Sequence, residues 1–281
     1  MAGTLFICAT PIGNLQDITL RVLEVLKDVD VIAAEDTRTT AKLLNHYGIK
    51  TPCISYHRHN EKARSEFLIA RLLEGENVAL VSDAGTPGIS DPGSIVIAAA
   101  IEAGINVVSL PGPTACIAAL VASGLPSDRF VFEGFLPRNR KQRRERLEDL
   151  ASDPRTLVFY EAPHRLQESL EDFLSVLGDR RMVIIRELTK KFEEIVRGNI
   201  SELTAQTTHH EARGEYVLVV EGYTGLPIGE DKNDWKYLSV QEHMEKLMDQ
   251  GYSKKDAVKV VAQMRGLPRR EVYKYVEELF D

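Results

Sequence analysis

Short apolar runs alternate with amphipathic segments along this chain, and that rhythm limits the fold more than any other feature. In the first 110 residues the apolar runs are too short for helices, and they end at turn-forming residues. Strands are expected at 5–9, 31–34, 53–56, 78–81 and 107–110, with helices at 19–27, 39–47, 61–73 and 95–103. Continuously apolar strands separated by helices are typical of a parallel sheet that helices cover on both faces.

A second α/β unit is expected after Gly112 and Pro113, which open a helix at 114–123. Further strands are expected at 129–134, 156–160, 182–187, 193–198 and 216–221, with helices at 140–150 and 164–177. The late strands follow one another without long helices between them, which indicates a mixed sheet. A linker at 225–231 precedes three short helices, expected at 240–248, 254–265 and 269–279.

The predicted fold class is therefore α/β, with two domains and a small helical tail. The expected domains are 1–112 with a five-stranded parallel sheet, 113–225 with a mixed sheet, and a small basic helical domain at 233–281. A chain of 281 residues, 43% of them hydrophobic, is long enough to bury the cores that this division requires.

The most distinctive loop of the chain runs from Val81 to Gly93. Three glycines and two prolines fall within it, directly after the expected strand at 78–81. Glycine lets the backbone approach a ligand closely, and proline stiffens the loop. Ligands of open α/β sheets bind at the carboxyl ends of the strands, so this segment is either a binding loop or a plain connector.

Three further polar loops follow expected strands, at 10–15, 34–38 and 109–115. The loop at 10–15 has one glycine instead of the three in a dinucleotide fingerprint, which disfavours a Rossmann dinucleotide site. Because the carboxyl ends of parallel strands share one rim of the sheet, all four loops are expected to converge there. Four converging polar loops favour a binding pocket over four independent connectors.

The net charge of −7 conceals two basic segments. Residues 138–146 contain six basic side chains and one acidic one, and a second group of lysines and arginines lies between 253 and 275. Each segment either contacts a polyanion locally or forms a solvated helix face, and the charge pattern alone leaves both alternatives open.

Several classes of protein are disfavoured by the sequence. No apolar run reaches the ~18–20 residues that span a bilayer, and the N-terminus lacks the basic region of a signal peptide. Cys8, Cys53 and Cys116 have neither disulfide nor metal-ligand spacing, and the seven histidines are scattered. The expectation is a cytoplasmic protein with reduced thiols, no metal site and no membrane contact.

A series of motifs resembles the tetrapyrrole methylase superfamily, and within it most closely the branch that methylates ribosomal RNA. These motifs are 10–19, 35–38, 55–57, the loop 81–93, 160–165 and 214–217. The resemblance covers Gly3 to Glu221, and the C-terminal helices also resemble the tail of that branch. It implies a two-domain α/β fold, S-adenosyl-L-methionine bound in the cleft between the domains, and a homodimer. The implied reaction is 2′-O-methylation of a cytidine in the decoding region of 16S rRNA, with the small ribosomal subunit as partner.

Two departures from the superfamily pattern bear on the substrate. Members that make cofactors have a glycine-rich first loop where this chain has Pro11-Ile12-Gly13-Asn14, and tend to have a Gly-Asp-Pro turn at 83–87. Both differences point away from a porphyrin-like substrate. Arg58 stands where the ribosomal RNA branch is expected to have an acidic residue, so no role is assigned to position 58.

The resemblance, with the loop positions, implies a set of cofactor-binding residues drawn from both domains. They are Pro11, Gly13, Asp83, Ala84, Gly85, Thr86, Pro87, Thr114, Ala115, Tyr160, Glu161, Glu215, Tyr216 and Val217. The backbone near Gly85 and Ala115 is expected to contact the methionine and adenine ends, and Tyr160 to supply apolar cover. A sulfonium methyl donor is already activated, so aligning donor and acceptor can supply ~7–11 kcal/mol of the barrier reduction.

A ribose hydroxyl is a poor nucleophile and benefits from a general base within hydrogen-bond reach. Asp36 and Glu35 are the candidate catalytic residues, although both could instead hold Arg38 in an ion pair. His57 is a weaker candidate for the base. The expected RNA-binding residues are Arg38, His57, Arg138, Arg140, Lys141, Arg143, Arg144, Lys254, Lys255, Arg269 and Arg270. Phosphate contacts of this kind position a substrate without reading its sequence.

Two alternative functions remain open at this point. One is methylation of a precorrin-like tetrapyrrole, against which the basic tail and the first loop argue. The other is a ribosome-assembly factor that binds RNA without catalysis and keeps only a relic of the cofactor pocket. Cofactor binding separates the second alternative from an enzyme, and methyl transfer to small ribosomal subunits separates the first.

Overall fold

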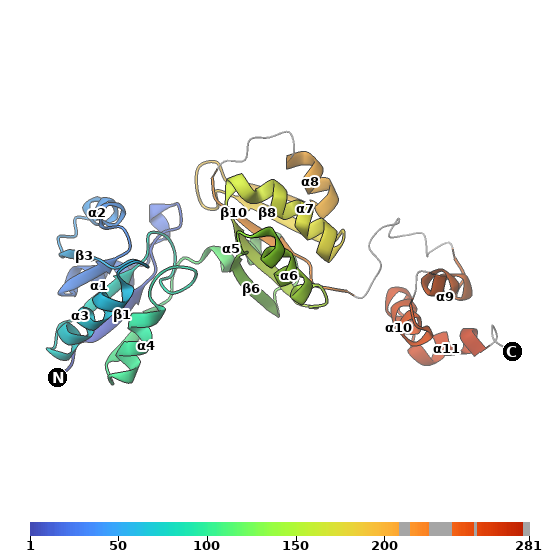
Figure 1. The fold of residues 1–281 in the computed structure, drawn as a ribbon, viewed down its shortest axis with the longest axis horizontal. Coiled ribbons are helices and arrows are strands. Elements are labelled where there is room, and N and C mark those ends of the chain that lie inside the picture. Colours follow the sequence, from blue (N-terminus) through green and yellow to red (C-terminus); the bar gives the residue numbers. More distant parts are fainter. Residues whose placement is uncertain (208–213, 225–237, 250–251, 278–281) are drawn as a thin grey trace.

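The computed structural model describes residues 1–207, 214–224, 238–249 and 252–277 (Figure 1). The first unit contains a five-stranded sheet in the order β3-β2-β4-β1-β5, and all its pairings are parallel. Its strands are β1 Thr4–Cys8, β2 Val31–Ala34, β3 Cys53–Ser55, β4 Val78–Val81 and β5 Asn106–Leu110. This order places the ends of β1, β2 and β4 side by side at the centre of one rim.

Helices cover both faces of this sheet, which explains why its central strands are apolar without alternation. They are α1 Leu20–Asp28, α2 Thr37–His46, α3 Glu61–Leu73 and α4 Ser94–Glu102. One core lies under α1 and α2 and includes Leu26 and Leu43. The other lies under α3 and α4 and includes Leu68 and Val96. The two-sided burial predicted from the apolar strands is confirmed.

The second unit contains a mixed sheet in the order β6-β7-β10-β8-β9, in which only β6 and β7 are parallel. Its strands are β6 Phe130–Phe135, β7 Thr156–Glu161, β8 Arg181–Arg186, β9 Glu194–Asn199 and β10 Tyr216–Val220. Its helices are α5 Ala115–Ser123, α6 Arg140–Leu150, α7 Leu166–Leu177 and α8 Ile200–Thr207. The predicted mixed sheet is confirmed, whereas α8 was not anticipated.

The two faces of the mixed sheet are covered unequally. Helices α6, α7 and α8 pack on one face through residues such as Leu147, Leu170 and Leu203. The other face packs on α5, where Leu120 meets Val158 and Val217. Alternate residues of β7 and β10 therefore point to opposite faces, which decides which of their side chains lie on the α5 side.

Three C-terminal helices form a small core of their own. They are α9 Val240–Asp249, α10 Lys254–Arg265 and α11 Arg269–Glu277. Leu247, Val258, Val261 and Val272 are buried in this core, while Tyr275 is 40% exposed and does not join it. The predicted linker at 225–231 lies outside the described residues. Within the described part of the chain, no helix is long and apolar enough to cross a membrane.

Candidate functional site

The loops that follow β1 and β4 are joined by a short backbone bridge. Thr10 and Gly85 exchange two N–H···O hydrogen bonds of 2.9 Å. The Thr10 hydroxyl also donates to the Ser82 carbonyl at 3.0 Å, and both side chains are buried. Two of the four polar loops predicted to converge are thus held together at the rim.

The loop after β5 joins them through close packing and hydroxyl contacts. A Cβ atom at Gly112 would lie 2.6 Å from the Cβ of Ala9, so only glycine permits this approach. The Thr86 and Thr114 hydroxyls are 2.8 Å apart, and Thr86 also donates to the Pro113 carbonyl at 3.2 Å. The segments around Ala9, Thr86 and Gly112 therefore form one continuous wall.

Gly85 requires glycine for a different reason. Its φ of +83° lies in the left-handed region, which other residues rarely adopt. A Cβ atom there would be 3.4 Å from Ile12 Cγ2 and 3.7 Å from the Pro113 carbonyl, which are ordinary contacts. Backbone conformation, and not lack of space, excludes a side chain at this position.

Tyr160 contributes to the α5 side of the second sheet. Its hydroxyl accepts a hydrogen bond of 3.1 Å from the Cys116 N–H in the first turn of α5. The rings of Phe132 and Phe135 meet the tyrosine ring edge-on, with centroids 4.9 and 5.6 Å away. Burial raises the pKa of Tyr160, so the phenol stays neutral. The residue is a fixed apolar surface whose hydroxyl is held at Cys116.

Two predicted cofactor residues have side chains on the opposite face of this sheet. The Glu161 carboxylate is 1% exposed, accepts a 2.5 Å hydrogen bond from Ser169 on α7, and lies 3.4 Å from Arg165. Tyr216 packs in the core beneath α6, α7 and α8. Strand alternation turns both side chains away from the α5 side, so these side chains give no support to the prediction that Glu161 and Tyr216 bind the cofactor.

Carboxylates gather where β2 and β4 end. The Asp36 N–H donates to Asp83 Oδ1 at 3.0 Å, and the Asp83 N–H donates to Glu35 Oε2 at 3.5 Å. Burial raises the pKa of both Glu35 and Asp83. The structure therefore brings the predicted residues of the loops after β2 and β4 together.

Asp36 is engaged in an ion pair. Its carboxylate accepts hydrogen bonds from the Arg38 Nε at 3.1 Å and Nη2 at 2.7 Å, and it caps α2 by accepting from the Arg38 N–H. These hydrogen bonds lower the pKa of Asp36 to about 2. A carboxylate so stabilised is a weaker proton acceptor than its neighbours. These contacts match the alternative in which Asp36 holds Arg38 in an ion pair.

Asp91 belongs to the same acidic group and was not among the predicted site residues. Burial, followed by the charge of Glu35, raises the pKa of Asp91 to about 6. The neighbouring Ser90 has a φ of +67°, and its carbonyl accepts a 2.7 Å hydrogen bond from Arg58. The loop itself was singled out from the sequence, but the burial that distinguishes Asp91 comes from the tertiary structure.

His57 is held within its own turn. Asn60 accepts a hydrogen bond from the His57 N–H at 2.8 Å, and its amide nitrogen lies 3.3 Å from the imidazole Nε2. The ring is half-buried and takes part in local structure. These contacts provide no support for His57 as an RNA contact or as a general base.

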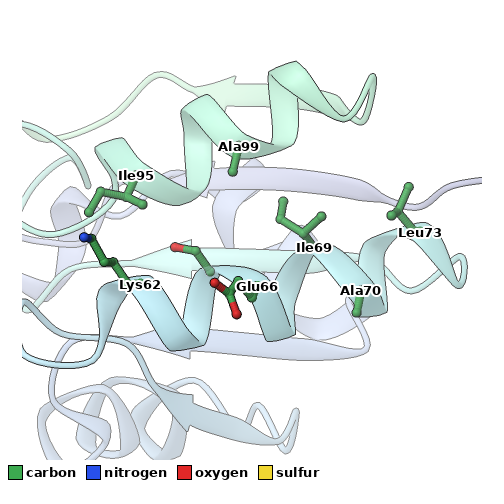
Figure 2. Close-up of a pocket in the computed structure, with 8 residues that line it drawn as sticks. Lys62, Glu66, Ile69, Ala70, Leu73, Ile95 and Ala99 are labelled. Carbon is green, nitrogen blue, oxygen red and sulfur yellow. The ribbon is translucent and has the colours of Figure 1, made fainter.

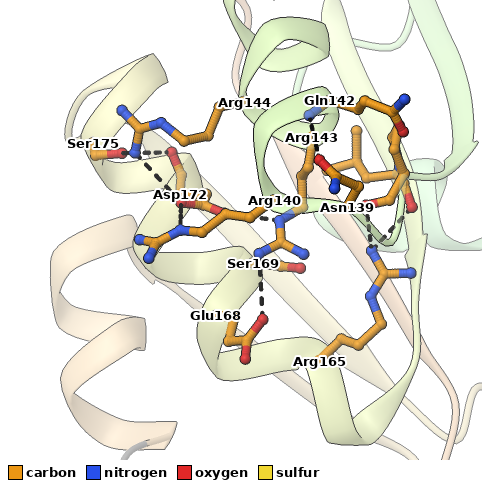
Figure 3. A network of polar contacts seen from close by, with 12 residues as sticks. Asn139, Arg140, Gln142, Arg143, Arg144, Arg165, Glu168, Ser169, Asp172 and Ser175 are labelled. Atoms are coloured by element: carbon orange, nitrogen blue, oxygen red, sulfur yellow. Dashed lines mark hydrogen bonds and ion pairs between the residues drawn. The ribbon is translucent and has the colours of Figure 1, made fainter.

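The basic segment on α6 is organised around one buried carboxylate (Figure 3). Asp172 on α7 is fully buried and binds Arg143 Nε at 2.8 Å, Arg140 Nε at 3.2 Å and Arg144 Nη1 at 3.4 Å. Arg143 is itself 1% exposed. The expectation that Arg143 contacts RNA is wrong, because its guanidinium is enclosed beneath α6.

Other predicted RNA-binding residues remain accessible. Arg140 and Lys141 have side chains that are 66% and 85% exposed. The exposed set also includes Arg38, Arg138, Lys254, Lys255, Arg269 and Arg270. The last four lie in the first turns of α10 and α11.

The two α/β units touch beside the first loop. A Cβ atom at Gly13 would lie 2.5 Å from Lys190 Cγ and 2.7 Å from Thr189 Oγ1. The Asn14 N–H donates to Thr189 Oγ1 at 3.1 Å. No local pattern in the sequence marks Thr189 or Lys190, because the contact joins positions far apart in the chain.

A separate hollow lies on the outer side of the first unit, between α3 and α4 (Figure 2). Its volume is about 490 Å³, and it is lined mainly by apolar residues, with Lys62 and Glu66 at its edge. None of the predicted site residues lines it. The loops at the rim, and not this hollow, form the candidate site.

Comparisons with known proteins found relatives along nearly the whole chain. The family model described as Tetrapyrrole (Corrin/Porphyrin) Methylases matches residues 4–204. A Halalkalibacterium halodurans protein named ribosomal RNA small subunit methyltransferase I is 48% identical over 271 residues, or 96% of this chain and 93% of that protein. A Synechocystis protein of the same name is 48% identical over 99% of this chain and 98% of its own.

The fold is also shared with solved structures. A uroporphyrin-III C-methyltransferase from Thermus thermophilus, complexed with S-adenosyl homocysteine, aligns with a TM-score of 0.55 at 19% identity. The alignment covers 78% of this chain and 97% of the other chain. At this identity the likeness concerns the fold, and it spans both α/β units.

Proposed function

Because this chain belongs to the tetrapyrrole (corrin/porphyrin) methylase family, we propose that it is an S-adenosylmethionine-dependent methyltransferase of small-subunit ribosomal RNA. The observation that carries the proposal is similarity along nearly the whole chain to proteins named for that activity. The covered length includes the C-terminal helices, which lie beyond the residues 4–204 of the family model. Porphyrin-related neighbours share the fold at much lower identity.

The rim of the first sheet suits such a cofactor. When bound, S-adenosylmethionine supplies an electrophilic methyl group on a positively charged sulfonium. Glu35, Asp83 and Asp91 provide negative charge at the strand ends, which favours a cation there. Thr114 directs its hydroxyl to Thr86 and not to the first turn of α5, where no side chain caps the helix. The chemistry of these groups fits a zwitterionic, cationic ligand.

The cofactor-binding residues that we propose lie on this wall and on the α5 side of the second sheet. They are Pro11, Gly13, Asp83, Ala84, Gly85, Thr86, Pro87, Thr114, Ala115, Tyr160, Glu215 and Val217. Tyr160 would supply a rigid apolar surface, because the Cys116 hydrogen bond and two phenylalanine rings fix its ring. Gly85 would shape the wall, because its left-handed backbone is held by hydrogen bonds to Thr10.

We propose that the 2′-hydroxyl of a cytidine in the decoding region of 16S rRNA is the methyl acceptor. The proton would pass to the carboxylate pair Glu35 and Asp91, whose raised pKa values make them better bases than Asp36. Asp36 would keep Arg38 at the mouth of the site, where a guanidinium can meet an RNA phosphate.

The proposed partner is the small ribosomal subunit, and the proposed location is therefore the cytoplasm. Exposed Arg138, Arg140 and Lys141, together with the exposed basic residues in the first turns of α10 and α11, would neutralise phosphates of the bound RNA. We also propose that the enzyme acts as a homodimer, as the family resemblance implies.

Calorimetry with S-adenosylmethionine is the first test of this proposal. An enzyme should bind the cofactor with a measurable heat, whereas a relic pocket in an assembly factor should show none. A parallel assay offers labelled cofactor with a reduced uroporphyrin-type macrocycle. Methyl transfer to the macrocycle, but not to ribosomal RNA, would replace this proposal with the tetrapyrrole alternative.

A further inference from the structure

The turn from Glu187 to Lys190, between β8 and β9, has an unusual backbone. Glu187 and Thr189 have φ values of +51° and +65°, although neither is glycine. Such conformations persist only where the surrounding structure enforces them, and they concentrate at binding and switch regions. In this turn, the enforcing contacts can be identified one by one.

The first set of contacts ties the turn to β10. The Glu187 N–H donates to the Glu215 carbonyl at 3.0 Å, and the Glu215 N–H donates to Glu187 Oε1 at 3.1 Å. A Cβ atom at Gly214 would lie 2.5 Å from Glu187 Oε1, and the φ of +85° at Gly214 favours glycine. Glu187 therefore occupies a fixed position over the start of β10.

Lys190 completes the set by bridging two carboxylates. Its ammonium donates to Glu187 Oε1 at 2.9 Å and to Glu215 Oε2 at 2.7 Å. Partial burial alone would lower the pKa of Lys190, but the hydrogen bonds to Glu215 and Glu187 outweigh it and the pKa is raised. The lysine therefore stays charged, and the two carboxylates hold its side chain in one direction.

The Lys190 side chain crosses the first loop of the other α/β unit. Lys190 Cγ would be 2.5 Å from a Cβ at Gly13, and Thr189 Oγ1 accepts the Asn14 N–H at 3.1 Å. The locked lysine stem therefore lies directly against the glycine of the loop at 10–15. One short turn connects Glu215, on the second unit, to Gly13, on the first.

We propose that this 187–190 turn sets the width of the cofactor cleft, with Lys190 as the positioning residue that holds the Gly13 wall against the Glu215 wall. The inference rests on the proposed function in that both walls would contact S-adenosylmethionine. Lys190 acts through these walls: it fixes the spacing between two loops before the ligand arrives, which reduces the ordering cost of binding.

The direct test compares Lys190→Met with Lys191→Met. Methionine keeps an apolar stem against Gly13 but removes both ion pairs, and Lys191 is an adjacent exposed lysine over the Phe192 ring. Calorimetry should show S-adenosylmethionine binding weakened about three- to tenfold in Lys190→Met, the range expected for partly exposed ion pairs. Lys191→Met should bind as the wild type does, and Lys190→Arg should recover most of the affinity.

Hydrogen exchange tests the role of the 187–190 turn without any ligand. Amides of the first loop should exchange faster in Lys190→Met than in Lys191→Met, while amides of β4 keep their protection. Equal exchange and equal affinity in the two variants would overturn the proposal. A wild-type protein that fails to bind the cofactor would instead contradict the proposed function, and the exchange comparison would still decide the role of the turn.

A double-mutant cycle tests the contact between the two units. Gly13→Ala should weaken cofactor binding because the new methyl group displaces the Lys190 stem. Combining it with Lys190→Ala should cost less than the sum of the two single losses, since both changes act on one contact. Strictly additive losses would show that Gly13 and Lys190 act separately and would overturn the proposal.

Discussion

Asp91 is the residue whose surroundings suit proton transfer most closely. Its carboxyl is partly buried beside Glu35 and Asp83, and its pKa is raised to about 6. Replacing it with asparagine should lower the methyl-transfer rate about 10²-fold or more while the cofactor dissociation constant changes little. Single-turnover assays and calorimetry measure the two quantities separately.

The pH dependence of the reaction tests whether Asp91 is the general base. A general base must be ionised, so the wild-type rate should rise with pH through about 6 and then level off. This rise should be lost in Asp91→Asn and kept in Asp128→Asn, a change at an exposed aspartate paired with Arg129. An Asp91→Asn rate close to that of the wild type would remove Asp91 from the mechanism.

Gly112 gives a prediction about the wall of the site. Gly112→Ala would bring two Cβ atoms within 2.6 Å of each other, because Ala9 stands directly opposite. We expect a loss of about 1–3 kcal/mol in the free energy of unfolding, as for other overpacked sites. Urea denaturation followed by circular dichroism measures this loss. Adding Ala9→Gly should restore much of it, and a double variant no more stable than Gly112→Ala would contradict the packing argument.

At the scale of single elements, α6 separates two kinds of basic residue. Arg143 is enclosed with Asp172, so Arg143→Ala leaves a buried carboxylate without its closest partner and should cost about 3–5 kcal/mol. Lys141 is 85% exposed, so Lys141→Ala should leave stability within about 0.5 kcal/mol. Lys141→Ala should also reduce the slope of log RNA affinity against log salt concentration by about one, as expected for the loss of one phosphate contact. An Arg143→Ala protein of wild-type stability would refute the buried pair.

The contrast between these arginines shows what the sequence could and could not predict. The bounds predicted for α3, α6 and α10 match the structure to the residue, and turn-forming residues flank α3 and α10 in the sequence. The burial of Arg143 depends on Asp172, which lies 29 residues further along the chain on another helix. Charge density on α6 could not distinguish the enclosed arginine from its exposed neighbours.

The candidate site was predictable to a similar extent. Parallel topology alone required the loops after β1, β2, β4 and β5 to share one rim. Strand alternation turns the Glu161 and Tyr216 side chains to the opposite face. Predicting this requires the exact bounds of β7 and β10 and knowledge of which helices pack on each face. The contact between Gly13 and Lys190 joins two units across more than half of the chain, and no local pattern indicates it.

In the whole molecule, the rim of the first sheet and the C-terminal helices have separate proposed roles. The C-terminal helices have their own core and carry exposed basic residues, so they can hold RNA without shaping the cofactor site. Deleting residues 233–281 should weaken binding to ribosomal RNA about tenfold or more and leave cofactor affinity intact. Filter binding and calorimetry measure these effects. Undiminished RNA affinity would instead make the tail an element of assembly or of the proposed dimer.

The central claim is that this chain methylates small-subunit ribosomal RNA at a ribose. It is tested most directly by incubating the protein and labelled S-adenosylmethionine with small ribosomal subunits from cells that lack the enzyme. The account predicts label in 16S rRNA, confined after nuclease digestion to one 2′-O-methylated cytidine in the decoding region. Label on a base, or no label in the RNA while the cofactor still binds, would contradict it.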